Sequence, residues 1–241
     1  MVAGTKAETV IAIIEKIPLK QRNLVNEITL DMAGNMGLIA KKCFPKAIQV
    51  TDRFHVQKLA TEALQEIRIK HRWKAIDQEN EAMEQAKSSK TKYEPKILTN
   101  GDTLKQLLAR SRYFLYKNKS KWSESQKKRA DLLFDLYPDI HKAYDLTQDL
   151  RNIFENTTDK IIAFARLAKW HEKINQSGFK SFNTISRTIT NHYQNILNYF
   201  DNRSTNSSAE SFNAKIKAFR SQFRGVRNIE FFLFRLTNIY A

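Results

Sequence analysis

The sequence predicts a mostly helical protein built around a small α/β core. Two short apolar runs of strand type, Ile28–Leu30 and Ala47–Val50, flank a helix-length segment at Ala33–Cys43. Parallel strands need a crossover of this kind, so these residues form a strand–helix–strand unit. From residue 56 to residue 200 the apolar residues recur at helical spacing, with no strand pattern. The predicted layout is a small α/β unit, a large all-helical excursion, and two helices that return to the α/β unit.

The individual helices follow from apolar residues at every third or fourth position, bounded by proline, glycine or capping residues. We expect the last helix to be buried because it is rich in Phe and Leu. For the helix that starts at Asp159, we expect Thr157 or Thr158 as the cap. The predicted helices are Thr5–Ile17, Ala33–Cys43, Val56–Ser88, Ser123–Leu136, Asp139–Phe154, Asp159–Ile174, Phe179–Phe200, Ser208–Phe223 and Asn228–Tyr240.

The charge is the most informative feature of the composition. The 241 residues carry a formal net charge of +16 and 41% hydrophobic residues, which describes a basic globular protein. Such a charge favours a polyanionic partner, most often nucleic acid, over a basic surface that is merely solvated. We expect no signal peptide from the first residues given, no apolar run reaches membrane length, and Cys43 is the single cysteine. We therefore expect a cytoplasmic, nucleoid-associated protein without a disulfide framework.

Residues 104–130 are rich in cations and aromatic rings. They contain nine Lys or Arg and only one acidic residue, Glu124. Cations for phosphates and flat rings for bases are the components of grooves that bind nucleic-acid strands. The rings could equally belong to a core, and for Phe114 we expect the core. The cations include Lys117, Lys119 and Lys121, and the other rings are Tyr113, Tyr116 and Trp122.

Two carboxylates are candidates for chemistry. Asp31 follows the first strand, and open α/β sheets place their sites at the carboxyl ends of strands. Glu210 lies on a late helix, on the side away from its apolar stripe. Phosphodiester chemistry uses two divalent ions held by such carboxylates, so we expect Asp31 and Glu210 to meet in space. Alternatively, Asp31 caps the following helix, and Glu210 completes a capping box with Ser207.

Four motifs resemble a known family. They occur in order as LDMAGNM at Leu30–Met36, CFPKAIQVTDRFHV at Cys43–Val56, RW at Arg72-Trp73, and NSSAESFNAKIK at Asn206–Lys217. Together they resemble the DDE transposases of bacterial insertion sequences, specifically the group with an all-helical insertion and a C/D-x-x-H motif. The resemblance extends over essentially the whole chain.

The resemblance implies a ribonuclease H-like catalytic domain and Mg²⁺ or Mn²⁺ as the cofactor, with two ions in the intact enzyme. It makes Asp31 and Glu210 the catalytic, metal-binding residues. Asp52 and His55 match the D-x-x-H element, which would brace the site. A rival assignment makes Asp52 the catalytic carboxylate and Asp31 only a cap. The implied domains are a partial ribonuclease H-like core at 1–55, an all-helical insertion at 56–203, and C-terminal helices at 204–241.

The resemblance also implies DNA as the partner, both the ends of the element and its target, and a homo-oligomer in the intact transposase. Metal-bound water would cleave at the end of the element, and the freed 3′ hydroxyl would attack target DNA. Cations on the late helix and in the basic stretch would hold the DNA backbone. We expect this role for Asn213, Lys215, Lys217, Arg220, Arg224, Lys117, Lys119 and Lys121.

One departure from the family pattern concerns the first catalytic aspartate. In the ribonuclease H-like order, strands one to three precede the first helix, and strand one carries an aspartate. Here Ile28–Leu30 would be strand four, and no aspartate precedes it in the sequence. We therefore expect an incomplete domain that binds DNA but does not cleave it alone. The alternatives are a non-enzymatic basic helical nucleic-acid-binding protein and an inhibitor of full-length transposase.

Overall fold

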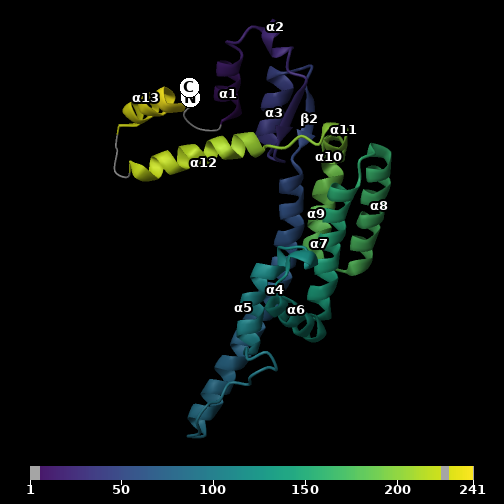
Figure 1. Cartoon of the computed structure of the whole chain (residues 1–241), viewed down its shortest axis with the longest axis vertical. Coiled ribbons are helices and arrows are strands. Elements are labelled where there is room, and N and C mark those ends of the chain that lie inside the picture. Colours follow the sequence, from purple (N-terminus) through teal and green to yellow (C-terminus); the bar gives the residue numbers. More distant parts are fainter. Residues whose placement is uncertain (1–5, 224–227, 241) are drawn as a thin grey trace. The chain divides into compact units, whose positions relative to one another are not determined.

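The computed structural model of the chain describes residues 6–223 and 228–240. This part of the chain is mostly helical, with a two-stranded parallel sheet, as the sequence predicts (Figure 1). It separates into two compact units. The sheet unit comprises the described parts of Met1–Phe54 and Gln194–Ala241, and the helical unit is His55–Tyr193. None of the helices described is long and apolar enough to cross a membrane.

The sheet of the sheet unit is the predicted strand–helix–strand. Strand β1 (Glu27–Leu30) pairs in parallel with β2 (Ile48–Thr51), and Leu30 lies opposite Thr51 in the register. Helix α3 (Gly34–Cys43) makes the crossover between them. Because the strands are parallel, both of their carboxyl ends lie at the same edge of the sheet.

Two further helices, α1 (Ala7–Ile14) and α2 (Leu19–Arg22), complete the N-terminal part of the sheet unit (Figure 1). Helix α1 packs on α3 through a small apolar core of Ala7, Ile11, Ile39 and Cys43. Burial of an isoleucine side chain such as Ile11 contributes about 2 kcal/mol. Arg22 closes this core with an Nη1 donation to the Cys43 carbonyl at 2.5 Å.

The segment at 198–202, which follows the helical unit, is fixed to the sheet by two asparagines. Asn198 donates its Nδ2 to the Gln49 carbonyl of β2 at 2.9 Å, and Asn202 donates its Nδ2 to Glu27 Oε2 of β1 at 2.9 Å. The single helix predicted at Phe179–Phe200 is wrong because the backbone leaves the helical path at His192 and the helix is interrupted again at Asn198. The observed helices are α9 (Lys180–Asn191), α10 (Tyr193–Leu197) and α11 (Tyr199–Asn202).

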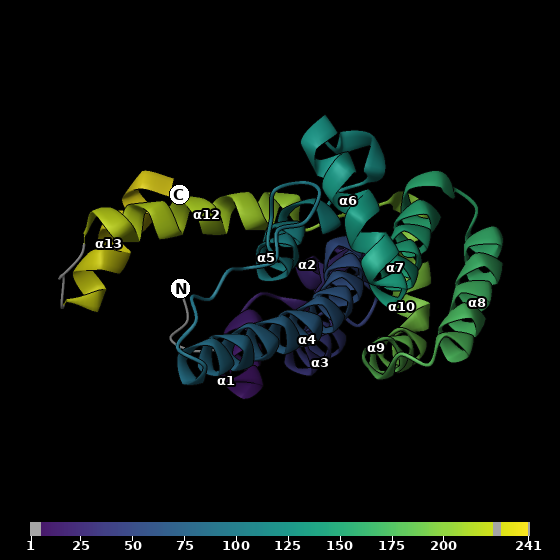
Figure 2. The ribbon, with the colours of Figure 1, turned by 90° about the horizontal axis from the view of Figure 1, so that it is seen from below.

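The helical unit is a layered pack of helices in which α7 lies beside α8 and α8 beside α9 (Figures 1 and 2). Its core contains Tyr144, Phe114 and Phe182, all nearly inaccessible to solvent. The buried indole of Trp122 donates Nε1 to the Phe114 carbonyl at 2.8 Å. The elements are α4 (Arg53–Ser88), α5 (Leu104–Leu115), the 3₁₀ helix η1 (Lys119–Lys121), α6 (Glu124–Leu136), α7 (Pro138–Asn156), α8 (Lys160–Ser177) and α9.

Two helix starts in this unit differ from the sequence prediction. Helix α5 falls in the basic stretch, where no helix was predicted, and it begins with a capping box between Thr103 and Gln106. Helix α8 is capped by Asp159, which accepts from the Ile162 backbone N–H at 2.8 Å, rather than by Thr157 or Thr158. Asp159 directly precedes the first helical residue, so its carboxylate reaches the free N–H groups of the first turn.

The last two helices, α12 (Ser207–Gln222) and α13 (Ile229–Tyr240), contact each other through the rings of Phe219 and Phe232, 5.4 Å apart. The prediction that the last helix is buried is wrong. Phe231 is 50% exposed and Phe234 is 61% exposed. The apolar residues of α13 are spread around the helix, so a contact on one side covers only part of them.

Candidate active site at the carboxyl edge of the sheet

Asp31 and Asp52 are neighbours at the carboxyl edge of the sheet. Each directly follows a strand, and their preceding residues, Leu30 and Thr51, are partners in the parallel register. The Asp52 backbone N–H also donates to the Leu30 carbonyl at 2.9 Å. Adjacent strands lie about 4.8 Å apart, so two aspartates at successive strand ends share one local environment.

The two carboxylates nevertheless have different surroundings. Asp52 is 2% exposed, and both of its oxygens accept backbone hydrogen bonds. Its Oδ1 accepts from the Phe54 N–H at 2.8 Å, which fixes the start of α4. Its Oδ2 accepts from the Asn206 N–H at 2.8 Å, 154 positions along the chain. Asp52 therefore joins the end of β2 to the residue that precedes α12.

Asp31 is half-buried, and its only hydrogen bond in the described part of the chain is the Oδ1 acceptance from the Ala33 N–H at 3.0 Å. Ala33 is the residue before α3 and α3 has no side-chain cap bond, so this bond forms a local turn before the helix and the alternative that Asp31 caps α3 is wrong. It uses one lone pair of Oδ1 and leaves Oδ2 available. A carboxylate in this state can hold the turn and still bind a cation.

Glu210 lies in the first turn of α12. The residue before the helix is Asn206, which makes no side-chain cap bond, so the predicted capping box between Ser207 and Glu210 is wrong. Glu210 follows Asn206 by four positions, which corresponds to an axial rise of about 6 Å along the helix. The Glu210 side chain is exposed and forms no hydrogen bond or ion pair with any described residue.

The donor set of this edge suits a hard cation but is small. Carboxylate oxygens are the ligands that Mg²⁺ and Mn²⁺ prefer, and the edge itself offers those of Asp31. Within 6–223 and 228–240, no three His, Cys, Asp or Glu side chains come together as a metal-binding group. His55 is half-buried in the first turn of α4, next to the turn that Asp52 caps.

Comparison with known proteins decides the family. A family model for DDE transposases of the ISL3 type, described as "Transposase", matches residues 1–236. The chain belongs to this transposase family. It is also 24% identical over 236 residues to the transposase for insertion sequence element IS1001 of Bordetella parapertussis. That match covers 97% of this chain and 52% of the relative, so the chain spans about half the length of this relative. No solved structure matches the chain.

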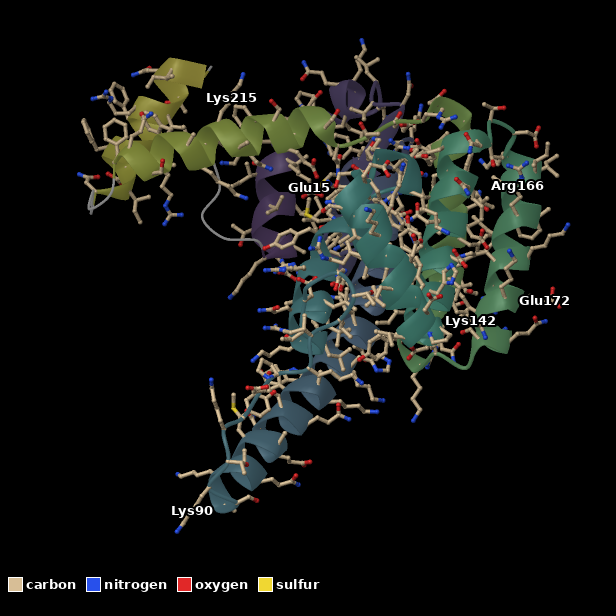
Figure 3. The ribbon with its side chains drawn as sticks, turned by 60° about the horizontal axis from the view of Figure 1, so that its bottom comes forward. Glu15, Lys90, Lys142, Arg166, Glu172 and Lys215 are labelled. Carbon is tan, nitrogen blue, oxygen red and sulfur yellow. The ribbon has the colours of Figure 1, made fainter. Side chains whose placement is uncertain are left out.

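The DNA-binding residues predicted on the late helix are exposed wherever the structure describes them. Asn213, Lys215, Lys217 and Arg220 are exposed on α12, from which Lys215 projects in Figure 3. None of the three cations forms an ion pair with a described residue. Arg224 lies outside the described residues. Beyond Glu210, α12 therefore presents these cations and carries no acidic residue.

The predicted cations of the helical unit are exposed too, but they differ in their partners. Lys119 pairs with Asp145 at 3.7 Å and lies over the Tyr144 ring, 5.6 Å from its centroid. Lys117 and Lys121 form no ion pair within the described residues. Lys119 is thus partly neutralised, whereas the charges of Lys117 and Lys121 are available to a partner.

The asparagines that position this site were not predicted from the sequence. Asn198 and Asn202 tie the returning chain to β2 and β1, and Asn206 presents its N–H to Asp52. Their only sequence signal is a spacing of four residues in a polar stretch, which does not identify partners 149 to 175 positions away.

Proposed function

We propose that this chain carries the carboxylate edge and the DNA-binding helix of an insertion-sequence transposase that cleaves and transfers DNA strands. Asp31 and Glu210 would be its metal-binding catalytic residues, and Asp52 would be a positioning residue. The proposal includes a ribonuclease H-like origin for the sheet unit, with the helical unit as an insertion between β2 and α12.

The observation that carries the proposal is the hydrogen bond from the Asn206 N–H to Asp52 Oδ2 at 2.8 Å. It attaches the start of α12 to the strand end adjacent to Asp31. Glu210 follows one helical turn later, at the same end of α12. This contact supports our inference that two acidic side chains from distant parts of the sequence, Asp31 and Glu210, act at one edge of the sheet.

The same contacts favour Asp31 over Asp52 as the metal ligand. Both oxygens of Asp52 already accept backbone N–H groups, and the side chain is 2% exposed. A cation there would compete with two hydrogen bonds that hold α4 and α12. Asp31 and Glu210 have unengaged oxygens at the surface, which a cation and its waters can reach.

Divalent ions held by Asp31 and Glu210 would stabilise charge on the attacking and leaving oxygens of a phosphodiester. The chain's own residues do the rest of the binding. Lys215, Lys217 and Arg220 would contact phosphates along one side of α12, and the Asp52–Asn206 bond would fix the register between this helix and the strand edge. Two carboxylates are one fewer than the DDE triad, so we expect the purified chain to bind DNA without cutting it.

The test is an excision assay in cells that express the gene containing this chain, together with a donor plasmid carrying its insertion sequence. Asp31→Asn and Glu210→Gln should each reduce excision by about a hundredfold or more, because each removes a metal ligand. Glu172→Gln, on the exposed surface of α8, is the control and should leave excision unchanged. Normal excision by either site variant would leave only the non-enzymatic DNA-binding function.

A further inference from the structure

The aromatic residues of the basic stretch divide into two groups in the structure. Phe114 and Trp122 are core residues, 1% and 8% exposed. Tyr113 is 68% exposed and Tyr116 is 43% exposed, on the outer side and at the end of α5. Two phenol rings so close together in the sequence, both open to solvent, are not explained by packing within the chain.

Three arginines, Arg68, Arg72 and Arg112, lie near one of these rings, that of Tyr116. Arg68 of α4 is 4% exposed and donates Nε to Gln65 Oε1 at 2.5 Å and Nη1 to the Leu108 carbonyl at 2.7 Å. Burial lowers the pKa of Arg68, and the nearby charges of Arg72 and Arg112 lower it further. The Tyr116 phenol interacts with the same guanidinium and opposes that shift. Arg72, Arg112 and Tyr116 therefore each lie within electrostatic reach of Arg68.

This group of positive charges has no acidic partner. In the described part of the chain, no ion pair joins Arg68, Arg72 or Arg112 to a carboxylate. Like charges close together in a partly buried setting repel, which destabilises the fold unless an anion binds between them. The arrangement suits a ligand that carries negative charge and also has a flat apolar face for Tyr113 and Tyr116.

The backbone that presents the rings is held in place. Arg151 of α7 donates Nη2 to the Tyr116 carbonyl at 2.8 Å, and the buried Tyr144 donates its hydroxyl to the Lys117 carbonyl at 2.8 Å. These bonds use main-chain atoms of the turn after α5 and leave the side chains of Tyr116 and Lys117 unused. Arg151 and Lys117 add two more cations at this turn.

We propose that the α4–α5 patch, defined as Arg72, Arg112, Tyr113 and Tyr116, binds unpaired DNA. Its arginines would contact successive phosphates, and its tyrosines would stack on the bases between them. A duplex keeps its base faces inside the stack, so exposed rings add affinity only for a strand with unpaired bases. The patch extends the proposed function and rests on it only for the choice of DNA as the nucleic acid.

The test is fluorescence anisotropy with labelled oligothymidine, and with a duplex of mixed sequence, using the full chain. Tyr113→Ala/Tyr116→Ala should weaken oligothymidine binding by about tenfold or more, since each base–ring stack contributes substantially. Duplex binding should change by less than about twofold. Tyr113→Phe/Tyr116→Phe keeps both rings and should retain the oligothymidine affinity. These side chains are exposed, so the variants should fold, as circular dichroism would verify.

Matched controls separate the patch from general effects of charge and surface. Arg72→Gln/Arg112→Gln should weaken oligothymidine binding far more than Lys87→Gln/Lys92→Gln, which removes the same net charge elsewhere on the helical unit. Tyr193→Ala removes another exposed ring, 48% exposed, and should have no effect. An equal loss of duplex and oligothymidine affinity in the tyrosine double variant would overturn the proposal. Displacement of oligothymidine by polyglutamate at equal charge would also overturn it, in favour of an acidic protein partner.

This test is independent of the catalytic proposal. Duplex binding through Lys215, Lys217 and Arg220 involves a different unit and should persist when the patch is removed. If the patch fails while duplex binding and excision remain, only the role of the α4–α5 patch is refuted. If excision does not depend on Asp31 and Glu210 while the patch binds oligothymidine, only the catalytic assignment is refuted.

Discussion

Each unit of the described chain buries one aspartate, and the two are satisfied in opposite ways. Asp102 in the helical unit is 1% exposed and pairs with Arg110 and with Arg129, whose Nε lies 2.8 Å from Asp102 Oδ2. Asp52 in the sheet unit is 2% exposed and accepts only backbone N–H groups, from Phe54 and Asn206. The carboxylate of Asp102 is neutralised by two arginine side chains, whereas that of Asp52 is stabilised by the dipoles of backbone N–H groups.

The difference indicates two functions for buried charge. Asp102 holds together a loop, α5 and α6, all inside one compact unit. Asp52 holds two backbone segments at the edge where the carboxylates of Asp31 and Glu210 are proposed to act. Arginines at that edge would compete with a divalent cation for those carboxylates, whereas backbone N–H groups leave them free.

Removal of Asp102 should have the largest effect on stability. Asp102→Ala leaves Arg110 and Arg129 without their carboxylate, and Arg129 is only 21% exposed. Loss of one partner of a buried pair is strongly destabilising, and partial exposure of the arginines reduces the expected loss to about 2–3 kcal/mol. Urea unfolding followed by circular dichroism measures it. DNA binding by the folded protein should be unchanged, and a weaker affinity would show that Asp102 also supports a binding surface.

Removal of Asp52 should cost less stability but change the site. In Asp52→Ala, two backbone N–H groups lose their acceptor, at about 1 kcal/mol or more for each. The Asn206 amide should then exchange with deuterium much faster, while amides of the helical unit keep their protection. Hydrogen exchange read by NMR gives both rates. Unchanged protection of the Asn206 amide would contradict the bridging role of this carboxylate.

Asp52→Asn sharpens this comparison because it preserves shape. The amide keeps one oxygen as an acceptor and turns an NH₂ group toward the other backbone N–H, so one of the two bonds is removed. We expect intermediate stability and a large loss of excision. Asp102→Asn should show the reverse, with a stability loss and little change in excision per folded molecule.

The helix that Asp52 positions should account for most of the salt-sensitive DNA binding by the sheet unit. Lys215→Gln/Lys217→Gln/Arg220→Gln removes three cations from α12. The slope of log affinity for duplex DNA against log salt should become shallower by about 0.9 for each phosphate that the variant no longer neutralises. A slope equal to that of the unsubstituted chain would place the duplex-binding surface elsewhere.

The smallest effect concerns Cys43, whose buried thiol is stabilised neither by a paired arginine, as Asp102 is, nor by backbone N–H groups, as Asp52 is. Burial, and then the charge of Glu15, raises the pKa of its thiol. The pKa of the Cys43 thiol in the folded protein therefore lies above its unfolded value of about 8.5. The contribution of the buried neutral thiol to stability is complete below this unfolded value, and it is lost as the pH rises through the folded pKa. Alkylation at pH 8 should therefore be much slower than for an unfolded thiol, and should reach the unfolded rate in urea. Rapid alkylation of the native protein would contradict the core assignment.

Local patterns in the sequence predicted the strand–helix–strand unit and most helices, because apolar period and helix ends are encoded within a few residues. Long-range polar contacts were not predictable in the same way. The role of Asn206 depends on one backbone N–H that donates to a carboxylate 154 positions away, and no pattern of side chains in the sequence indicates this contact. The exposure of α13 was missed for a related reason, since composition does not show how many sides of a helix find a partner.

The central proposal is that Asp31 and Glu210 bind the same divalent cation. Paramagnetic Mn²⁺, titrated into the isotopically labelled chain, broadens NMR signals close to its binding site. We expect the amides next to Asp31 and those next to Glu210 to broaden together, and Asp31→Asn or Glu210→Gln to abolish both effects. Broadening near one carboxylate that persists after substitution of the other would contradict the shared site.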